Sequence, residues 1–143
     1  MTTIALDNAG YIAWDSQITA EGARLPYIID KVWIADGKIY AFAGDVGVMD
    51  KIIEWHRAGA VAEGYPKGSW SLLVLRRRGA SVYTDDAPFA SKVQAPFAIG
   101  SGTAYALGAL AAGASAFDAV RIAAKYDTHT GGKVNTLHRT DIK

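Results

Sequence analysis

Residues 2–7, TTIALD, and residues 11–15, YIAWD, decide the fold of this 143-residue chain. Each stretch is short, apolar and rich in strand-forming residues, and the intervening Asn8-Ala9-Gly10 is typical of a turn. We therefore expect two neighbouring strands at the start of the chain, Thr3 to Asp7 and Tyr11 to Trp14.

Thr2 would carry two reactive groups, a hydroxyl and a free α-amino group, if Met1 were removed. A hydroxyl is a weak nucleophile at its own pKa, and an N-terminal amine is one recognised base that activates a threonine. The α-amino group titrates near ~7.7–8.0 and a lysine near ~10.4, so the amine is the better proton acceptor at neutral pH. Thr2 is therefore a candidate nucleophile, and Lys31 is better suited to act through its charge.

The rest of the chain alternates between strand pairs and helices. Asp36-Gly37 separates two β-rich runs, Ile28 to Ala35 and Lys38 to Ala43, and an Asp-Gly loop is a strong hairpin signal because both positions need positive φ. Apolar residues at helical spacing predict a helix from Val48 to about His56. The same patterns predict strands at Ser71 to Leu75, Ser81 to Thr84, Phe97 to Ile99 and Val134 to Leu137, and helices at Tyr105 to Ala112 and from the capping residue Ser115. Hairpins dominate and the helices stand apart, which indicates an α+β fold with mostly antiparallel sheets.

The composition is that of an ordinary globular protein, and we expect one domain, residues 1–143. Half of the residues are hydrophobic, the net charge is +1, and there is no cysteine. The lack of cysteine excludes disulfides, thiolate metal sites and a cysteine nucleophile. The near-neutral charge argues against nucleic acid or a membrane surface as the main partner, and Arg76-Arg77-Arg78 is interpreted as a solvated hairpin tip. No apolar stretch reaches the about 20 residues of a bilayer span and no signal peptide is visible, so we expect a cytoplasmic protein.

Six short motifs occur in an order that resembles the proteasome β-subunit and bacterial HslV peptidase family of N-terminal-nucleophile (Ntn) hydrolases. The resemblance runs over nearly the whole chain and rests on the order and spacing of the motifs, because each of them alone is weak. They are Thr2-Thr3-Ile4, Trp14-Asp15-Ser16-Gln17-Ile18-Thr19, Asp30-Lys31-Val32, Phe42-Ala43-Gly44, Ile99-Gly100-Ser101-Gly102 and Asp127-Thr128-His129-Thr130-Gly131-Gly132. The family fold is a four-layer αββα sandwich of two mostly antiparallel sheets flanked by helices, which agrees with the α+β prediction.

The resemblance implies roles for Thr2 and three residues around it. The family's nucleophile is the mature N-terminal Thr, here Thr2, and its buried Asp and Lys fall on Asp15 and Lys31. The positive charge of Lys31 would lower the pKa of the Thr2 amine and hydroxyl, and Asp15 would hold Lys31 charged and aimed. The oxyanion donor would be the backbone N–H of Gly44, a contribution of ~3–4 kcal/mol, with a glycine there so that the substrate can approach the backbone.

Three further residues correspond to supporting groups of the family. Ser101, in a Gly-Ser-Gly turn, matches a supporting Ser. Asp127 and Thr130 match a supporting pair in which the proteasome usually has Ser at the second position. The resemblance implies no cofactor and no catalytic metal, although some HslV relatives hold a cation on backbone carbonyls near the equivalent of Asp127 to Thr130.

The resemblance also implies where a substrate would bind. Family members bind an extended peptide as an added strand, and here the backbone of Thr19 and Gly44 would offer that contact. Trp33, Phe42 and Val46 fall where residues of the side-chain pocket are expected. These side chains would favour an apolar residue before the cleaved bond.

The implied function is a threonine-type endopeptidase that matures by removal of Met1 and cleaves polypeptides within a homo-oligomeric ring. An ATP-dependent unfoldase is a further partner by analogy. Two alternatives stay open: an Ntn amidohydrolase that acts on a small amide, and a catalytically silent ring or scaffold homologue that keeps Met1. The stretch before Gly100 is shorter than in ordinary β-subunits and has one convincing helix instead of two, so the sequence predicts neither ring symmetry nor the ATPase contact.

Overall fold

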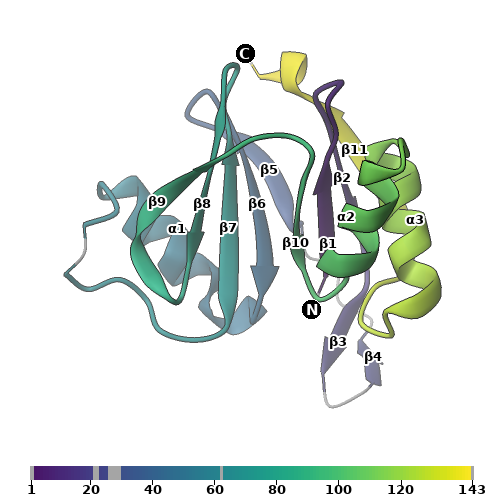
Figure 1. Ribbon diagram of the computed structural model, residues 1–143. Helices are drawn as coiled ribbons and strands as arrows, with labels where there is room; N and C mark the ends of the chain where they lie inside the picture. Colours follow the sequence, from purple (N-terminus) through teal and green to yellow (C-terminus); the bar gives the residue numbers. More distant parts are fainter. Residues whose placement is uncertain (1, 21–22, 26–29, 62, 143) are drawn as a thin grey trace.

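Two antiparallel sheets lie face to face, and helices cover their outer sides (Figure 1). The structure is a computed structural model that describes residues 2–20, 23–25, 30–61 and 63–142. Strands and helices occupy separate layers, in the order helix, sheet, sheet, helix. The α+β class and the αββα arrangement expected from the sequence are therefore confirmed.

The first sheet contains the N-terminal strand. Its four antiparallel strands, in spatial order, are β10 (Phe97–Gly100), β1 (Thr3–Leu6), β2 (Tyr11–Asp15) and β11 (Val134–His138). β1 is central, with Thr3 opposite Gly100 on one side and Ile4 opposite Trp14 on the other. Pairing on both sides fixes the start of β1, and this places Thr2 at one end of the sheet.

The second sheet is a meander in chain order. Its strands are β5 (Val32–Ala35), β6 (Lys38–Gly44), β7 (Trp70–Leu75), β8 (Ala80–Thr84) and β9 (Ala87–Val93). The Asp36-Gly37 hairpin is confirmed, with φ of 54° and 72° at its two positions. β5 begins later than expected, and Ile28 lies outside the described residues.

Three strands escaped the sequence analysis. β9 lies at the edge of its sheet and contains Pro88, a residue that edge strands tolerate but that obscures a strand pattern. The other two form a separate ribbon, β3 (Ile18–Ala20) and β4 (Ala23–Leu25). Each has only three residues, which is too short for an alternating pattern to show.

The helices divide between the two sheets. α1 (Met49–Arg57) follows the 3-10 turn η1 (Val46–Val48) on the second sheet, α2 (Thr103–Ala111) and α3 (Ala116–Tyr126) cover the first sheet, and the 3-10 turn η2 (Arg139–Asp141) lies near the C-terminus. α3 starts as the sequence indicates, because the Ser115 hydroxyl accepts a hydrogen bond from the Asp118 N–H at 3.1 Å. Among the described residues, no helix is both long and apolar enough to cross a bilayer.

Three apolar clusters hold the layers together. Between the sheets the largest fully buried side chains are Ile4, Leu6, Ile12, Ile39, Leu73 and Leu75. Small residues dominate between the first sheet and α2 and α3, whereas aromatic residues dominate between the second sheet and α1. Burial of one large aliphatic side chain contributes ~1.5–3 kcal/mol, so the paired sheets form a rigid base for the end of β1.

Gly44 ends β6 in a conformation that other residues rarely adopt. Its φ is 141°, and an added Cβ would collide with the Ser69 carbonyl oxygen and lie 2.6 Å from Trp70 Cα. The close approach of β7 therefore requires a glycine here. This is a second reason for the glycine, beside the approach of a substrate, which stays a prediction.

Gly44→Ala is expected to lower the free energy of unfolding by at least about 1–3 kcal/mol, because a strained backbone conformation costs that much before any collision is counted. Gly108→Ala is the matched control. An added Cβ at Gly108 in α2 meets no atom within 4 Å, and alanine is favoured over glycine in a helix by roughly 0.5–1 kcal/mol. Urea denaturation measures both variants, and a Gly44→Ala protein as stable as the wild type would contradict the crowding.

Candidate active site

Thr2 lies just before β1, in contact with both ionic residues that the sequence singles out. Its Oγ1 accepts a hydrogen bond from Lys31 Nζ at 2.6 Å and donates one to Asp15 Oδ1. Lys31 Nζ also lies 3.1 Å from Asp15 Oδ1, so the three side chains contact one another. Thr2 is 2% exposed, Asp15 0% and Lys31 3%. The Asp15–Lys31 pair is thus a buried ion pair placed directly against a hydroxyl.

The Lys31 ammonium group has three acceptors. They are Thr2 Oγ1, Asp15 Oδ1 and the Gln17 carbonyl oxygen, the last at 2.6 Å. Three acceptors match the three N–H bonds of an ammonium group. Burial lowers the pKa of Lys31, because desolvation disfavours the charged form, while the charge and hydrogen bond of Asp15 oppose that shift. Lys31 therefore loses its proton more readily than an ordinary lysine, and Asp15 limits the loss.

Asp15 is anchored through both carboxylate oxygens. Oδ1 accepts a hydrogen bond from the Thr3 N–H and Oδ2 accepts one from the Gly131 N–H, each at 3.0 Å. Asp15 ends β2, Thr3 begins β1, and Gly131 lies in the loop between α3 and β11. One carboxylate therefore joins three segments of the chain and fixes the direction from which it meets Lys31.

A second hydrogen-bonded group, built on Asp127, holds the backbone next to Thr2. Asp127 Oδ2 accepts hydrogen bonds from Ser101 Oγ and Thr130 Oγ1, each at 2.5 Å. The Ser101 N–H donates to the Thr2 carbonyl oxygen at 2.8 Å, and Thr130 Oγ1 lies 2.6 Å from Thr3 Oγ1. The structure therefore brings Ser101, Asp127 and Thr130 together. Ser101 holds the backbone of Thr2, and Thr130 holds the side chain of the next residue, Thr3.

Asp127 is ionised at neutral pH. Burial alone would raise the pKa of its carboxyl group, but hydrogen bonds from Ser101, Thr130 and the His129 N–H outweigh burial and bring the pKa below its ordinary value. An ionised carboxylate can accept from both hydroxyls at once. Asp127 also caps the C-terminal end of α3, so its position follows from where that helix stops.

Gly100 explains why the Gly-Ser-Gly pattern lies beside Thr2. Its φ is 101°, and an added Cβ would collide with the Thr2 carbonyl oxygen and lie 2.8 Å from the Thr2 carbonyl carbon. Only glycine lets the end of β10 pass this close to residue 2. Gly-Ser-Gly tripeptides usually indicate only a turn. Here the pattern also indicates that β10 passes close to the N-terminal strand.

The sequence analysis missed Thr3 and Gln17. Gln17 donates from Nε2 to the Thr128 carbonyl oxygen and from its backbone N–H to the Gly131 carbonyl oxygen, both at 3.1 Å. Its carbonyl oxygen accepts from Lys31, so Gln17 ties the loop after α3 to the ammonium group. Thr3 and Gln17 both lie within the motifs that carry the family resemblance, and this position in the motifs could have indicated that they belong to the site.

A cation near Asp127 to Thr130 stays a prediction. Among the described residues, no group of three or more His, Asp or Glu could hold a metal ion. The carbonyl oxygens of Asp127, Thr128 and Gly131 each accept a protein hydrogen bond. Hydrogen-bond donors of the protein therefore hold this loop.

The expected side-chain pocket is only partly compatible with the structure. Phe42 is 1% exposed within the aromatic cluster between the second sheet and α1. This corrects its predicted role as a pocket residue, because a side chain buried to this degree belongs to the core. Trp33 stacks on Tyr40 with ring centroids 5.5 Å apart on the same face, and Val46 is half-buried in η1. The backbone of Thr19 lies in β3, while its side chain lies outside the described residues.

The nitrogen of Thr2 belongs to the peptide bond with Met1. An amide nitrogen is not a base, because its lone pair is delocalised into the carbonyl group. The site therefore contains a hydroxyl beside the Lys31 ammonium group, and it gains a basic amine only when the bond between residues 1 and 2 is cleaved.

Solved structures with the same architecture match almost the whole chain. BPH from Thiobacillus denitrificans in complex with epoxomicin is 21% identical, with a TM-score of 0.72 over 96% of this chain and 97% of that chain. Eukaryotic HslV from Trypanosoma brucei is 20% identical, with a TM-score of 0.74 over 96% of this chain and 99% of that chain. No protein-family model and no curated protein matches the sequence.

This chain therefore has the αββα fold that BPH from Thiobacillus denitrificans and HslV from Trypanosoma brucei share, over 96% of its length. The resemblance to the proteasome and HslV family is thereby confirmed at the level of the fold. Fold alone does not establish an activity, and any chemistry depends on the residues around Thr2.

Proposed function

We propose that this protein is a threonine-type peptidase whose nucleophile is Thr2 Oγ1, activated when the bond between Met1 and Thr2 is cleaved. The observation that supports this most is the 2.6 Å contact between Thr2 Oγ1 and Lys31 Nζ, in a buried site completed by Asp15. A buried ion pair adds little net stability. Its placement against a hydroxyl therefore favours a chemical role over a purely structural one.

In the proposed mechanism, Thr2 Oγ1 attacks the carbonyl carbon of the cleaved peptide bond, and the α-amine of Thr2 takes the hydroxyl proton. The Gly44 N–H stabilises the developing oxyanion. The carbon–nitrogen bond then breaks, the proton passes to the leaving amine, and an ester remains on Thr2. Water, activated by the same amine, hydrolyses the ester and restores the hydroxyl.

The remaining residues position these groups. The charge of Lys31 lowers the pKa of the Thr2 amine and hydroxyl, because a nearby cation disfavours further protonation. Asp15 holds Lys31 in its charged form. Ser101, Asp127 and Thr130 fix the backbone of Thr2 and the side chain of Thr3 through the contacts described above.

Polypeptides are the proposed substrates, bound as an added strand against the backbone of β3 and Gly44. The test compares fluorogenic peptides with small acyl-amides, using protein that lacks Met1. Peptide turnover supports the proposal. Turnover of small amides alone would assign the amidohydrolase alternative, and no turnover of either class would favour the silent scaffold.

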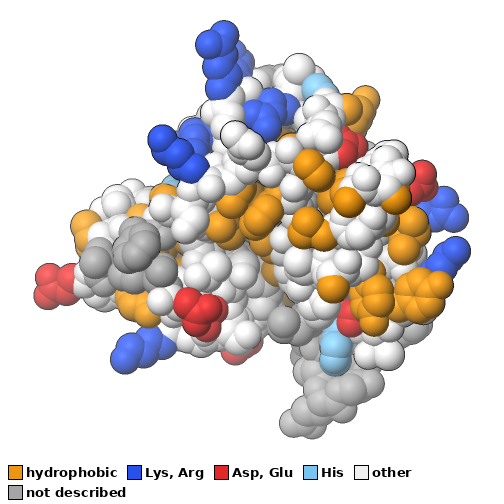
Figure 2. All heavy atoms as spheres, in the orientation of Figure 1, with side chains coloured by type: hydrophobic (Ala, Val, Ile, Leu, Met, Phe, Trp, Pro, Cys, Tyr) orange, Lys and Arg blue, Asp and Glu red, His pale blue; other side chains and the backbone are white. Residues whose placement is uncertain are grey.

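We also expect a homo-oligomer in solution. Hydrophobic side chains lie exposed over α2 and α3 (Figure 2), including Tyr105 at 45%, Phe117 at 41% and Tyr126 at 65%. α2 itself carries no charged residue, and exposed apolar surface of this kind is typical of protein–protein contacts. Light scattering should give a multiple of the 15.2 kDa subunit mass. A strictly monomeric mass would count against a ring.

A further inference from the structure

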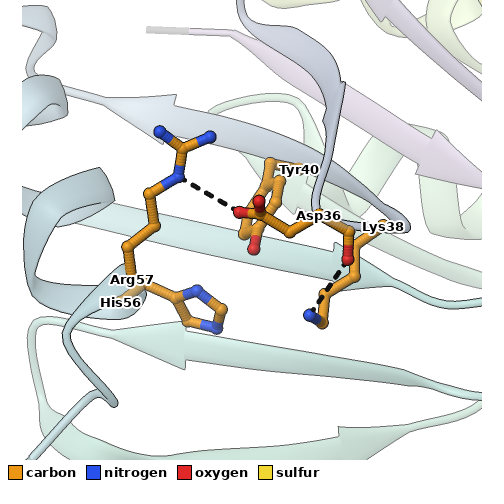
Figure 3. Close-up of a pocket in the computed structure, with 5 residues that line it drawn as sticks. All are labelled: Asp36, Lys38, Tyr40, His56 and Arg57. Carbon is orange, nitrogen blue, oxygen red and sulfur yellow. Dashed lines mark hydrogen bonds and ion pairs between the residues drawn. The ribbon is translucent and has the colours of Figure 1, made fainter.

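An open hollow of about 460 Å³ lies at the end of the second sheet that carries the β5–β6 turn (Figure 3). Asp36 and Lys38 line it from that turn, Tyr40 from β6, and His56 and Arg57 from the end of α1. Gly44 stands at the opposite end of β6 from Lys38, roughly 20 Å along the strand at ~3.3 Å per residue. The hollow is therefore separate from the Thr2 site.

Hydrogen-bond donors outnumber acceptors in this hollow. Arg57 donates from Nε to Asp36 Oδ2 at 3.2 Å, and Lys38 Nζ reaches the Asp36 carbonyl oxygen only at 3.4 Å. Among the described contacts, the other guanidinium N–H groups of Arg57 and the Tyr40 hydroxyl have no protein acceptor. Asp36 supplies the one carboxylate of the lining against two cationic side chains. The chemistry of the lining therefore suits an anion.

His56 adds a buried polar atom that lacks a partner. In the part of the chain that the structure describes, Nδ1 of His56 is buried without a hydrogen bond. Such an atom costs about 1–3 kcal/mol. The ring is held edge-on against Tyr40 and Tyr83, with centroids 5.2 and 5.1 Å away, so it cannot simply turn towards solvent. The His56 ring that lines the hollow is therefore fixed in place.

We propose that this hollow binds a dianionic oxyanion, such as a phosphate or sulfate group, between Lys38 and Arg57. The anion replaces Asp36 as the acceptor for Arg57 and takes hydrogen bonds from His56 and Tyr40. The Arg57–Asp36 pair is about half exposed, at 52% and 53%, and an exposed pair contributes only ~0–1 kcal/mol. Asp36 is therefore easily displaced. This site does not depend on the chemistry proposed for Thr2.

Binding is coupled to the protonation of His56. Burial and the positive charges of Lys38 and Arg76 lower the pKa of His56, and Asp36 opposes them only weakly. The groups that face its ring from all sides are Lys38, Arg76, Asp36, Arg57, Tyr40 and Tyr83. A bound dianion raises the pKa of His56, so anion affinity rises as the pH falls through that pKa.

The test titrates sulfate at constant ionic strength and follows the His56 ring resonances by NMR. Sulfate is the probe because it stays dianionic through the histidine titration. We expect a saturable shift, a rise of about one unit in the His56 pKa, and a several-fold weaker response to acetate, which carries one charge. His138, held by Thr140 and the Ala9 carbonyl oxygen, is the internal control. No saturable shift at His56, an equal shift at His138, or acetate binding as tightly as sulfate overturns the proposal.

Three variants complete the test. Arg57→Gln should weaken sulfate binding at least about tenfold, through loss of a charge-assisted hydrogen bond. Arg121→Gln is the matched control, because Arg121 forms a similarly exposed pair with Asp118 on another helix, and it should leave binding unchanged. Asp36→Asn should strengthen binding several-fold, because it removes the competing carboxylate while asparagine tolerates the φ of 54°. Weaker binding in Asp36→Asn, or unchanged binding in Arg57→Gln, would contradict the site.

Discussion

Thr2→Ala is expected to abolish peptide cleavage, with a fall in kcat of at least about 10³-fold, in a protein that keeps its fold. Loss of a nucleophile removes the covalent pathway, and the remaining donors and bound water supply only residual catalysis. The fold should survive because Thr2 precedes β1, and Lys31 retains two of its three acceptors. Steady-state kinetics with a fluorogenic peptide measures the activity, and circular dichroism measures the fold.

Thr2→Ser is the matched control for that experiment. Serine keeps the hydroxyl and the α-amine and loses only a methyl group, so measurable turnover should remain. Full turnover by Thr2→Ala would show that another group attacks the substrate, and the assignment of Thr2 would be rejected. Equal inactivity of the serine variant would show that the threonine methyl group, and not only the hydroxyl, is required.

Asp15→Asn is expected to lower the free energy of unfolding by ~3–5 kcal/mol, because it leaves the Lys31 ammonium group buried without its counter-charge. Lys31 is 3% exposed, so solvent cannot replace the lost carboxylate. The double variant Asp15→Asn with Lys31→Met removes both charges and should recover much of that loss. Urea denaturation of the two single variants and the double variant forms a cycle that isolates the pair. A loss below about 1 kcal/mol in Asp15→Asn would contradict a charged Lys31.

The pH dependence of stability gives a second measure of the same pair. The pKa of Lys31 is lowered in the folded protein, so between this pKa and the unfolded value near ~10.4 the unfolded chain binds more protons. Stability contributed by this group therefore rises with pH across that window. Asp15→Asn lowers the folded pKa further and extends the window to lower pH, whereas a variant with Lys31→Met should lose this slope.

The start of the chain and its hairpins were predictable because their signals are local. Residues 2–15 contain two short apolar strand segments around a turn, and Asp36-Gly37 specifies a hairpin by its φ requirements. The contact among Thr2, Asp15 and Lys31 was predictable for a different reason, since the order of motifs along the chain matched a known family. In both cases the information lay in short stretches of sequence.

The parts that could not be predicted depend on contacts between distant segments. Gln17 joins the loop after α3 to Lys31 through contacts between segments that are far apart in the sequence. Phe42 is buried because α1 covers its side of the sheet. The hollow around His56 likewise combines a hairpin turn with the end of a helix. The burial of a side chain depends on how the layers pack, so it cannot be predicted from the pattern within one segment.

Thr2, as the first residue of the mature chain, is the proposed attacking group. The direct measurement is intact mass of the protein from its native cells, followed by reaction with epoxomicin and mapping of the adduct. We expect a mass lower by one methionine residue and an adduct on Thr2 that Thr2→Ala prevents. A chain that keeps Met1, or an adduct on any other residue, would contradict it.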